Sequence, residues 1–235
     1  MIYKSYLIEQ NFSINENLTL FYGENLGLKN LFQKKIKEQN KDSEIISYNQ
    51  EDILKDENQI YNEILNRSLF NAKKIFLVNG VSDKIIDQIQ KIEKIIDDRK
   101  IFFFSDILEK KSKLRNYFEK SADAAIVACY NDNEITIKKI IQEQLKGFNN
   151  LTNQTINLIL NSSGLDRVKV DNEIQKIIAC FINKEIDQTK LETLLNIREN
   201  EDFNVLKDQA LIGNKIATNK FMSNTIRNIT IIAHV

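Results

Sequence analysis

The sequence is poor in the residues from which metal and redox sites are built. Among 235 residues there are two cysteines, Cys129 and Cys180, and one histidine, His234. Neither cysteine has a second cysteine or a histidine at metal-site spacing, so both are expected to be reduced, packed thiols. His234 has no catalytic neighbour in sequence. We therefore expect no metal site, no cofactor and no histidine-based catalysis.

The chain also lacks proline, a net charge and long apolar runs. The missing proline accompanies abundant asparagine, isoleucine and lysine, a bias that an AT-rich genome explains as well as a structural requirement does. Because 33 basic residues balance 33 acidic ones, no global field attracts nucleic acid, and such a contact needs a local patch. Apolar runs such as 100–104 are far shorter than the roughly 20 residues of a membrane helix. Residues 1–6 lack the features of a signal peptide, so we expect a soluble cytoplasmic protein with no membrane partner.

The first half of the chain alternates short apolar runs with helical, polar stretches. Continuous apolar runs of strand length are typical of a parallel sheet with helices on both faces. The sequence therefore predicts an α/β domain over residues 1–131. The expected strands are Leu18–Tyr22, Glu44–Tyr48, Lys74–Val78, Lys100–Phe104 and Ala124–Cys129, and the expected helices are Asn25–Gln39, Asp56–Arg67, Asp83–Ile96 and Lys111–Lys120.

The strand signals stop after residue 133, and the rest of the chain has helical periodicity. Apolar residues recur three and four positions apart, which indicates amphipathic helices. We expect a small helical domain over 132–198 and the beginning of another over 199–235. The expected helices are Glu134–Lys146, Thr152–Asn161, Asp166–Phe181, Asp187–Leu195 and Phe203–Met222.

The turn after the first strand is where a nucleotide-binding loop would lie. A working loop reads G-x-x-x-x-G-K-[ST], because backbone amides hold the phosphates, the lysine reaches the outer phosphates and the hydroxyl holds magnesium. Here Gly23 and Gly27 are one residue too close, and Leu28 separates Gly27 from Lys29. Asn30 replaces the hydroxyl residue. The sequence therefore predicts a degenerate phosphate loop.

The end of the third predicted strand also lacks the residues of a nucleotide-binding site. This strand should end in acidic residues that hold the metal of a nucleotide, yet Val78 is followed by Asn79 and Gly80. With the phosphate cradle, the metal hydroxyl and the metal carboxylate all missing, we expect neither ATP binding nor ATP hydrolysis.

Other catalytic motifs are absent from the sequence, and one cluster of basic residues is a candidate for DNA contact. The sequence contains no G-x-S-x-G elbow, no H-E-x-x-H and no Cys–His pair. Lys111, Lys113 and Arg115 are candidates for contact with a DNA backbone, and such contacts weaken with salt. The alternative interpretation is a solvated helix face, which the local pattern favours.

Two large apolar residues, Leu69 and Phe70, lie where an amphipathic segment runs into the apolar strand at 74–78. Most leucine and phenylalanine side chains are buried, so the local pattern favours packing in the core. The alternative is an exposed hydrophobic wedge offered to a partner.

Several segments, in order, resemble the delta subunit of the bacterial DNA polymerase III clamp loader. Each is weak alone, but together they span nearly the whole chain. The segments are Phe21–Asn25, Ser68–Ile75, Asp106–Arg115, Gly164–Asp166 with Asn172–Ile177, and Phe203–Ala217. The sister delta-prime subunit is a poorer match, because its Ser-Arg-Cys arginine finger and cysteine-rich zinc site are missing here.

The resemblance implies an AAA+-like sheet domain without ATPase activity, followed by a helical lid and a collar. It implies a protein that opens the sliding clamp (the beta subunit) as a non-enzymatic part of a DNA polymerase holoenzyme. Leu69 and Phe70 are the implied wedge, and Asn66, Arg67 and Ser68 complete the implied clamp-binding motif.

The collar is the main departure from the resemblance. The chain ends after the first expected collar helix, so assembly with other clamp-loader subunits is expected only if a collar is present, and DNA contact is expected to be indirect or weak. The alternatives are a divergent AAA+ nucleotide-binding protein that uses Lys29, and a replication adaptor that does not bind the clamp.

Overall fold

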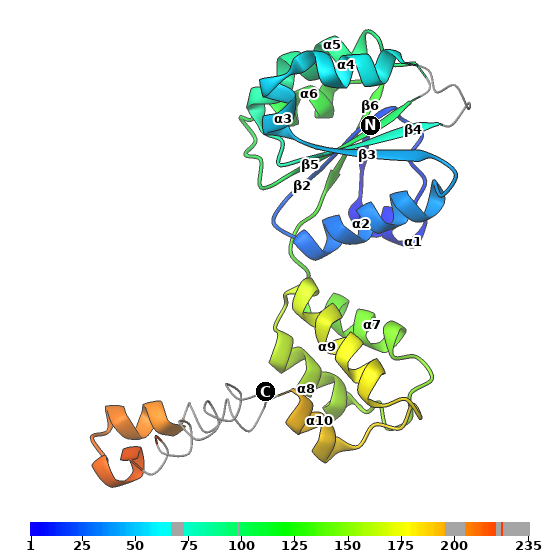
Figure 1. The fold of residues 1–235 in the computed structure, drawn as a ribbon. Coiled ribbons are helices and arrows are strands. Elements are labelled where there is room, and N and C mark those ends of the chain that lie inside the picture. Colours follow the sequence, from blue (N-terminus) through cyan, green and yellow to red (C-terminus); the bar gives the residue numbers. More distant parts are fainter. Residues whose placement is uncertain (67–72, 98, 196–204, 220–221, 223–235) are drawn as a thin grey trace. The chain divides into compact units, whose positions relative to one another are not determined.

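The computed structural model describes the chain except for residues 67–72, 98, 196–204, 220–221 and 223–235 (Figure 1). The chain divides into two compact units, Met1–Asn131 and Asp132–Val235.

The first unit is built on a six-stranded sheet in which every pair of neighbouring strands is parallel. The strand order is β1-β6-β2-β5-β4-β3. This confirms the predicted α/β fold and adds the short edge strand β1, which the sequence pattern did not indicate. The strands are β1 (Ile2–Tyr3), β2 (Leu18–Tyr22), β3 (Glu44–Asn49), β4 (Lys74–Asn79), β5 (Lys100–Ser105) and β6 (Ala124–Ala128).

Helices cover both faces of this sheet (Figure 1). Helices α1 (Ser5–Gln10) and α2 (Leu26–Gln39) lie on one face, where Phe32 packs on Phe21 of β2 with ring centroids 5.0 Å apart. Because successive side chains of a strand point to opposite faces, Leu20 of β2 lies in the other core. That core is covered by α3 (Gln50–Lys55), α4 (Glu57–Leu65), the 3₁₀ turn η1 (Asp83–Ile85), α5 (Ile86–Glu93) and α6 (Lys113–Lys120).

Two of these helices differ from the sequence-based expectation. An additional helix, α3, precedes α4, and Asp56 both ends α3 and begins α4, where its side chain accepts a hydrogen bond from the Asn58 amide at 3.1 Å. Helix α6 begins at Lys113 rather than Lys111, because the Ser112 side chain caps it by accepting from the Arg115 amide at 3.2 Å. In both places an oxygen side chain satisfies a first-turn N–H group and so fixes the boundary.

A parallel sheet has two chemically different edges. The connections that leave the strands, after Tyr22, Ser105 and Ala128, form what we call the carboxyl edge. The opposite ends, where the strands begin, as at Lys74 of β4, form the amino edge. Ligands of open α/β sheets bind at the carboxyl ends of the strands.

In the second unit, four helices enclose a separate apolar core that includes Ile141, Ile159 and Ile177. Each helix is capped by an oxygen side chain that accepts from its first turn, which satisfies N–H groups that otherwise lack partners. The helices are α7 (Glu134–Gln144), α8 (Asn153–Ser163), α9 (Arg167–Cys180) and α10 (Gln188–Leu194), with caps Asn133, Thr152, Asp166 and Asp187.

Two predictions for this half of the chain are wrong. The expected single helix over 203–222 is interrupted within its described part, because residues 205–211 and 215–219 are helical and Gly213 between them has φ +77°. Cys129 is buried as expected, but Cys180 is exposed rather than packed. Cys180 is the last residue of α9, and its side chain faces solvent.

Among the helices that the structure describes, none has both the length and the apolar character needed to cross a lipid bilayer.

Candidate functional site

The degenerate phosphate loop occupies the middle of the carboxyl edge, between β2 and α2. Gly23 has φ +132°, and its amide donates to the carbonyl oxygen of Asp106 at 3.2 Å. A Cβ added at Gly23 would lie 2.2 Å from the carbonyl oxygen of Cys129. No other residue fits there, because the backbone after β2 lies against the backbone after β6.

Asn25 binds the neighbouring connection through both backbone and side chain. Its amide donates to the Cys129 carbonyl oxygen at 3.0 Å, and its Nδ2 donates to the Tyr130 carbonyl oxygen at 3.1 Å. Its Oδ1 accepts from the Leu28 amide at 2.9 Å and so caps α2. Gly27 is the second residue of α2 and therefore lies in the helix rather than in a loop. The N–H groups of Gly23, Asn25 and Leu28 thus bind protein oxygens in the region where a working loop would hold phosphate.

Lys29 is held in the same way. Its side chain is only 7% exposed, and Nζ donates to the Ser105 carbonyl oxygen at 2.9 Å and to Asp106 Oδ1 at 3.1 Å. The first acceptor is on the last residue of β5, the strand beside β2, and the second is on the residue that follows it. The buried ammonium group therefore has the hydrogen bonds that burial of a charge requires.

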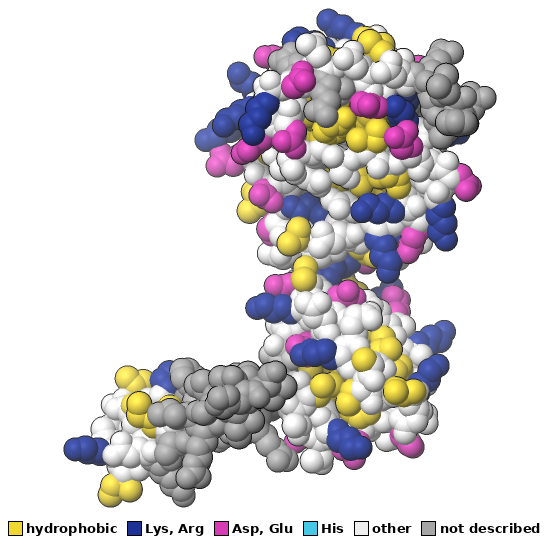
Figure 2. Space-filling view, viewed as in Figure 1, with side chains coloured by type: hydrophobic (Ala, Val, Ile, Leu, Met, Phe, Trp, Pro, Cys, Tyr) yellow, Lys and Arg dark blue, Asp and Glu magenta, His cyan; other side chains and the backbone are white. Residues whose placement is uncertain are grey.

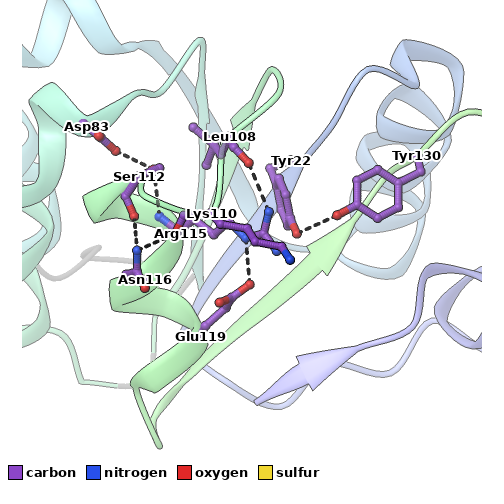
Figure 3. A network of polar contacts seen from close by, with 9 residues as sticks. All are labelled: Tyr22, Asp83, Leu108, Lys110, Ser112, Arg115, Asn116, Glu119 and Tyr130. Carbon is purple, nitrogen blue, oxygen red and sulfur yellow. Dashed lines mark hydrogen bonds and ion pairs between the residues drawn. The ribbon is translucent and has the colours of Figure 1, made fainter.

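A polar network lies beside this loop (Figure 3). The Arg115 guanidinium lies over the Tyr22 ring, 5.1 Å from its centroid, and binds Glu119 Oε1 at 2.7 Å and the Leu108 carbonyl oxygen at 3.2 Å. The Tyr22 and Tyr130 hydroxyls are 3.1 Å apart. Burial, followed by this hydrogen bond, raises the pKa of Tyr22 above its ordinary value of 10.0, so its hydroxyl stays protonated in mildly alkaline solution as well.

This network separates the three residues proposed for DNA contact. Arg115 is partly buried and engaged inside the unit, whereas Lys111 and Lys113 are exposed. Lys111 is paired with Glu109 at 2.9 Å. Basic and acidic side chains are interspersed over the face of the first unit seen in Figure 2. Any contact with a DNA backbone there therefore depends on the exposed Lys111 and Lys113, whereas Arg115 contributes to packing within the first unit.

Asp83, which sequence reasoning missed, connects η1 to the start of α6. Its Oδ1 accepts from the Ser112 hydroxyl at 2.5 Å and from the Leu114 amide at 3.0 Å. The hydrogen bond from the Ser112 side chain, followed by the one from the Leu114 backbone, lowers the pKa of Asp83. No local signal marks Asp83, because its partners are about thirty positions away in the chain.

At the amino edge, the junction between α4 and β4 has fixed ends. Ile60 and Ile64 of α4 are fully buried, whereas Leu65, the last residue of that helix, is 61% exposed. Lys74, the first residue of β4, binds Glu63 Oε2 at 2.6 Å. The ion pair thus joins the two elements on either side of the junction.

Most of the residues predicted to contact a clamp fall between these ends. Asn66 is described, and its amide donates to the Asn62 carbonyl oxygen at 2.8 Å as the helix ends. Arg67, Ser68, Leu69 and Phe70 lie outside the described residues. Their role stays a prediction.

Over the described part of the chain, no group of three or more His, Cys, Asp or Glu side chains is arranged to hold a metal ion.

Comparison with known proteins identifies the architecture. No protein-family model matches the sequence, and neither does any curated protein sequence. Among solved structures, the Bacillus subtilis DNA clamp loader delta protein (YqeN) superimposes with a TM-score of 0.61 at 12% identity, covering 95% of this chain and 71% of that one. The Thermotoga maritima RuvB Holliday junction branch migration motor gives a TM-score of 0.52 at 12% identity, covering 89% of this chain and 73% of that one. The chain has an AAA+-like fold. At such identities the similarity is one of fold, so the chemistry has to be argued from the residues.

Proposed function

We propose that this chain is a clamp-loader delta-type subunit, which binds a DNA polymerase sliding clamp and opens its ring through a hydrophobic wedge during DNA replication. The observation that supports this best is an AAA+-like fold, similar to a clamp loader delta protein over 95% of this chain, in which Gly23, Asn25 and Lys29 are held by protein contacts. These contacts favour a role in partner binding over nucleotide chemistry at this loop.

The wedge would consist of Leu69 and Phe70 at the amino edge, on a junction whose two ends are tied by Glu63 and Lys74. Burying two such side chains contributes roughly 3 to 6 kcal/mol, at about 1.5 to 3 each. Micromolar binding corresponds to about 8 kcal/mol. Flanking contacts, from Asn66, Arg67 and Ser68, would add the rest, with the pair as the centre of the interface.

Opening a ring requires more than binding to it. The protein must bind the open or strained clamp more tightly than the closed one, because a ligand with equal affinity for both states shifts neither. A wedge presented on a junction with fixed ends would strengthen binding to either state, since a loosely held segment would lose part of its binding energy on becoming ordered. The preference for the open ring would come from contacts that only the open interface offers.

The test is a pull-down with the cognate sliding clamp, followed by calorimetric titration with Mg-ATP. We expect clamp capture and no heat of nucleotide binding. Capture that fails with a correctly folded chain would favour a replication adaptor with other partners. Clear Mg-ATP binding that is lost on Lys29→Ala would favour a divergent nucleotide-binding protein.

A further inference from the structure

The connection between the two units is held tightly on the side of the first unit. Strand β6 ends at Ala128, and the division between units falls between Asn131 and Asp132. Cys129 is fully buried, and its amide donates to the Tyr22 carbonyl oxygen at 2.7 Å. The chain therefore leaves the sheet still bonded to the central strand.

The next two residues are held by the degenerate phosphate loop. Asn25 Nδ2 donates to the Tyr130 carbonyl oxygen at 3.1 Å. The Tyr130 hydroxyl, 3.1 Å from that of Tyr22, fixes the ring as well, as Figure 3 shows. The Asn131 amide donates to Glu24 Oε1 at 3.4 Å. Side chains of the loop that would cradle a phosphate in a nucleotide-binding protein thus hold the connection instead.

From Asp132 onward the chain is held to the second unit. Arg167 at the start of α9 donates to both carboxylate oxygens of Asp132, with Nε 2.8 Å from Oδ2 and Nη2 2.6 Å from Oδ1. Both side chains are only 7% exposed. Asn133 then caps α7 by accepting from the Thr136 amide at 2.9 Å. A two-pronged, buried ion pair of this kind fixes orientation as well as distance.

We infer that the two units turn about the single link between Asn131 and Asp132, and that Glu24 and Asn25 form a clasp that holds this joint in place. Contacts on both sides leave only the torsions of one link free, since the peptide bond itself is planar. Hinges of this type are a few residues that absorb the change in backbone angles. The inference does not depend on clamp binding.

The test measures the distance between the units by double electron–electron resonance. One nitroxide is placed on the native, exposed Cys180 and the other on a cysteine introduced by Lys84→Cys, at an exposed position of η1; Cys129 is buried. Asn25→Asp is the informative variant, because an aspartate keeps the oxygen that caps α2 but loses the amide that binds Tyr130. Asp132→Asn releases the other side of the joint.

Release of either side should increase the width of the distance distribution by roughly one half or more. The reason is that the free connection grows from one link to about three residues. The matched control is Asn116→Asp, which removes an amide that donates to the Lys110 and Ser112 carbonyl oxygens in the same unit; it should leave the width unchanged. Tyr130→Phe, which removes only a hydroxyl, should broaden the distribution by less than Asn25→Asp does, and serves if that variant fails to fold.

Three results would overturn the inference. The first is an unchanged width in all joint variants that retain the parent's circular dichroism spectrum. The second is equal broadening by the Asn116→Asp control. The third is a parent distribution as broad as that of the variants, because the clasp would then hold nothing.

Discussion

The two edges of the same parallel sheet differ in how their connections are held. At the carboxyl edge, three residues join β2 to α2, and Gly23 and Asn25 bind the backbone of neighbouring connections. At the amino edge, Glu63 of α4 binds Lys74, the first residue of β4. Buried polar groups need partners. The loop after β2 is bonded to protein oxygens, and the proposed clamp contact is at the other edge.

The largest effect should come from Gly23, where the carboxyl edge is tightest. Gly23→Ala would place an alanine at a φ of +132° and its Cβ 2.2 Å from the Cys129 carbonyl oxygen. Backbone strain and this clash should together lower the free energy of unfolding by about 3 kcal/mol or more. Gly80→Ala is the control, since Gly80 also has a positive φ but no atom within 4 Å of an added Cβ, and it should cost about 1 kcal/mol. Urea denaturation measures both. Equal costs would mean that the backbone approach at Gly23 is not tight.

Lys29 tests whether the carboxyl edge is structural. Lys29→Met keeps the buried stem but removes the bonds to Ser105 and Asp106, so it should destabilise the protein by about 1 to 2 kcal/mol. Lys34→Met, at an exposed position of the same helix, should have an effect within about 0.5 kcal/mol of zero. A Lys29→Met variant as stable as the parent would contradict a structural role for this lysine.

The ion pair at the amino edge should matter more for binding than for stability. Lys74→Met breaks the pair with Glu63, whose side chain is 37% exposed, so it should cost less than about 1 kcal/mol of stability. Clamp affinity should fall by about threefold to tenfold, because the ends of the junction are less fixed.

The charge-reversed double variant, Glu63→Lys with Lys74→Glu, should restore most of that affinity. Lys138→Met, which breaks an exposed pair with Glu134 in the second unit, is the control and should leave affinity unchanged. Surface plasmon resonance measures all of these. Lys74→Met with full clamp affinity would show that the pair does not position the junction.

The smallest effect should be a pH-dependent one at Asp83. Its pKa in the folded protein lies below the value of about 3.9 in the unfolded chain, because Ser112 and Leu114 donate to its carboxylate. The ionised group therefore stabilises the fold above about pH 4, and this contribution is lost as the pH falls through the lowered pKa.

Asp83→Asn should accordingly cost about 0.5 kcal/mol at pH 7, at the low end for an exposed hydrogen bond. The cost should shrink as the pH is lowered below about 4. Asp87→Asn, at an exposed position of α5, is the control. Thermal melts of the parent and both variants between pH 3 and 7 measure this cost. A stability cost of Asp83→Asn that grows as the pH falls would contradict the predicted direction of the pH dependence.

Local pattern predicted the elements of the fold well, and contacts between distant residues account for what it missed. The apolar runs at 18–22 and 100–104 predicted buried strands because a strand covered on both faces is apolar throughout. The spacing of Gly23, Gly27 and Lys29 predicted a degenerate loop. The partners that hold this loop, Asp106 and Tyr130, are far away in the chain, and no local rule points to them.

Three smaller errors have equally specific causes. The division between α3 and α4 depends on the side chain of Asp56, which competes with helix continuation. The break near Gly213 has a local cause, because Gly213 has φ +77° and the Asn214 side chain accepts from the Ala217 amide at 3.3 Å where the helix starts again. The exposure of Cys180 depends on what packs against α9, which periodicity does not reveal. The same limit applies to Leu69 and Phe70: the local sequence pattern favours the core and the resemblance implies exposure, and both residues lie outside the described part of the chain.

The most direct test of the central claim is the affinity of the cognate sliding clamp for three forms of this chain, measured in one titration series. The forms are the parent, Leu69→Ala with Phe70→Ala, and Lys29→Met. We predict that the double substitution lowers clamp affinity by at least about a hundredfold, from the loss of roughly 3 kcal/mol of buried apolar surface, while the parent's fold is retained, and that Lys29→Met binds like the parent. A double variant that unfolds, or that binds the clamp as tightly as the parent, would contradict the assignment of the wedge to the amino edge.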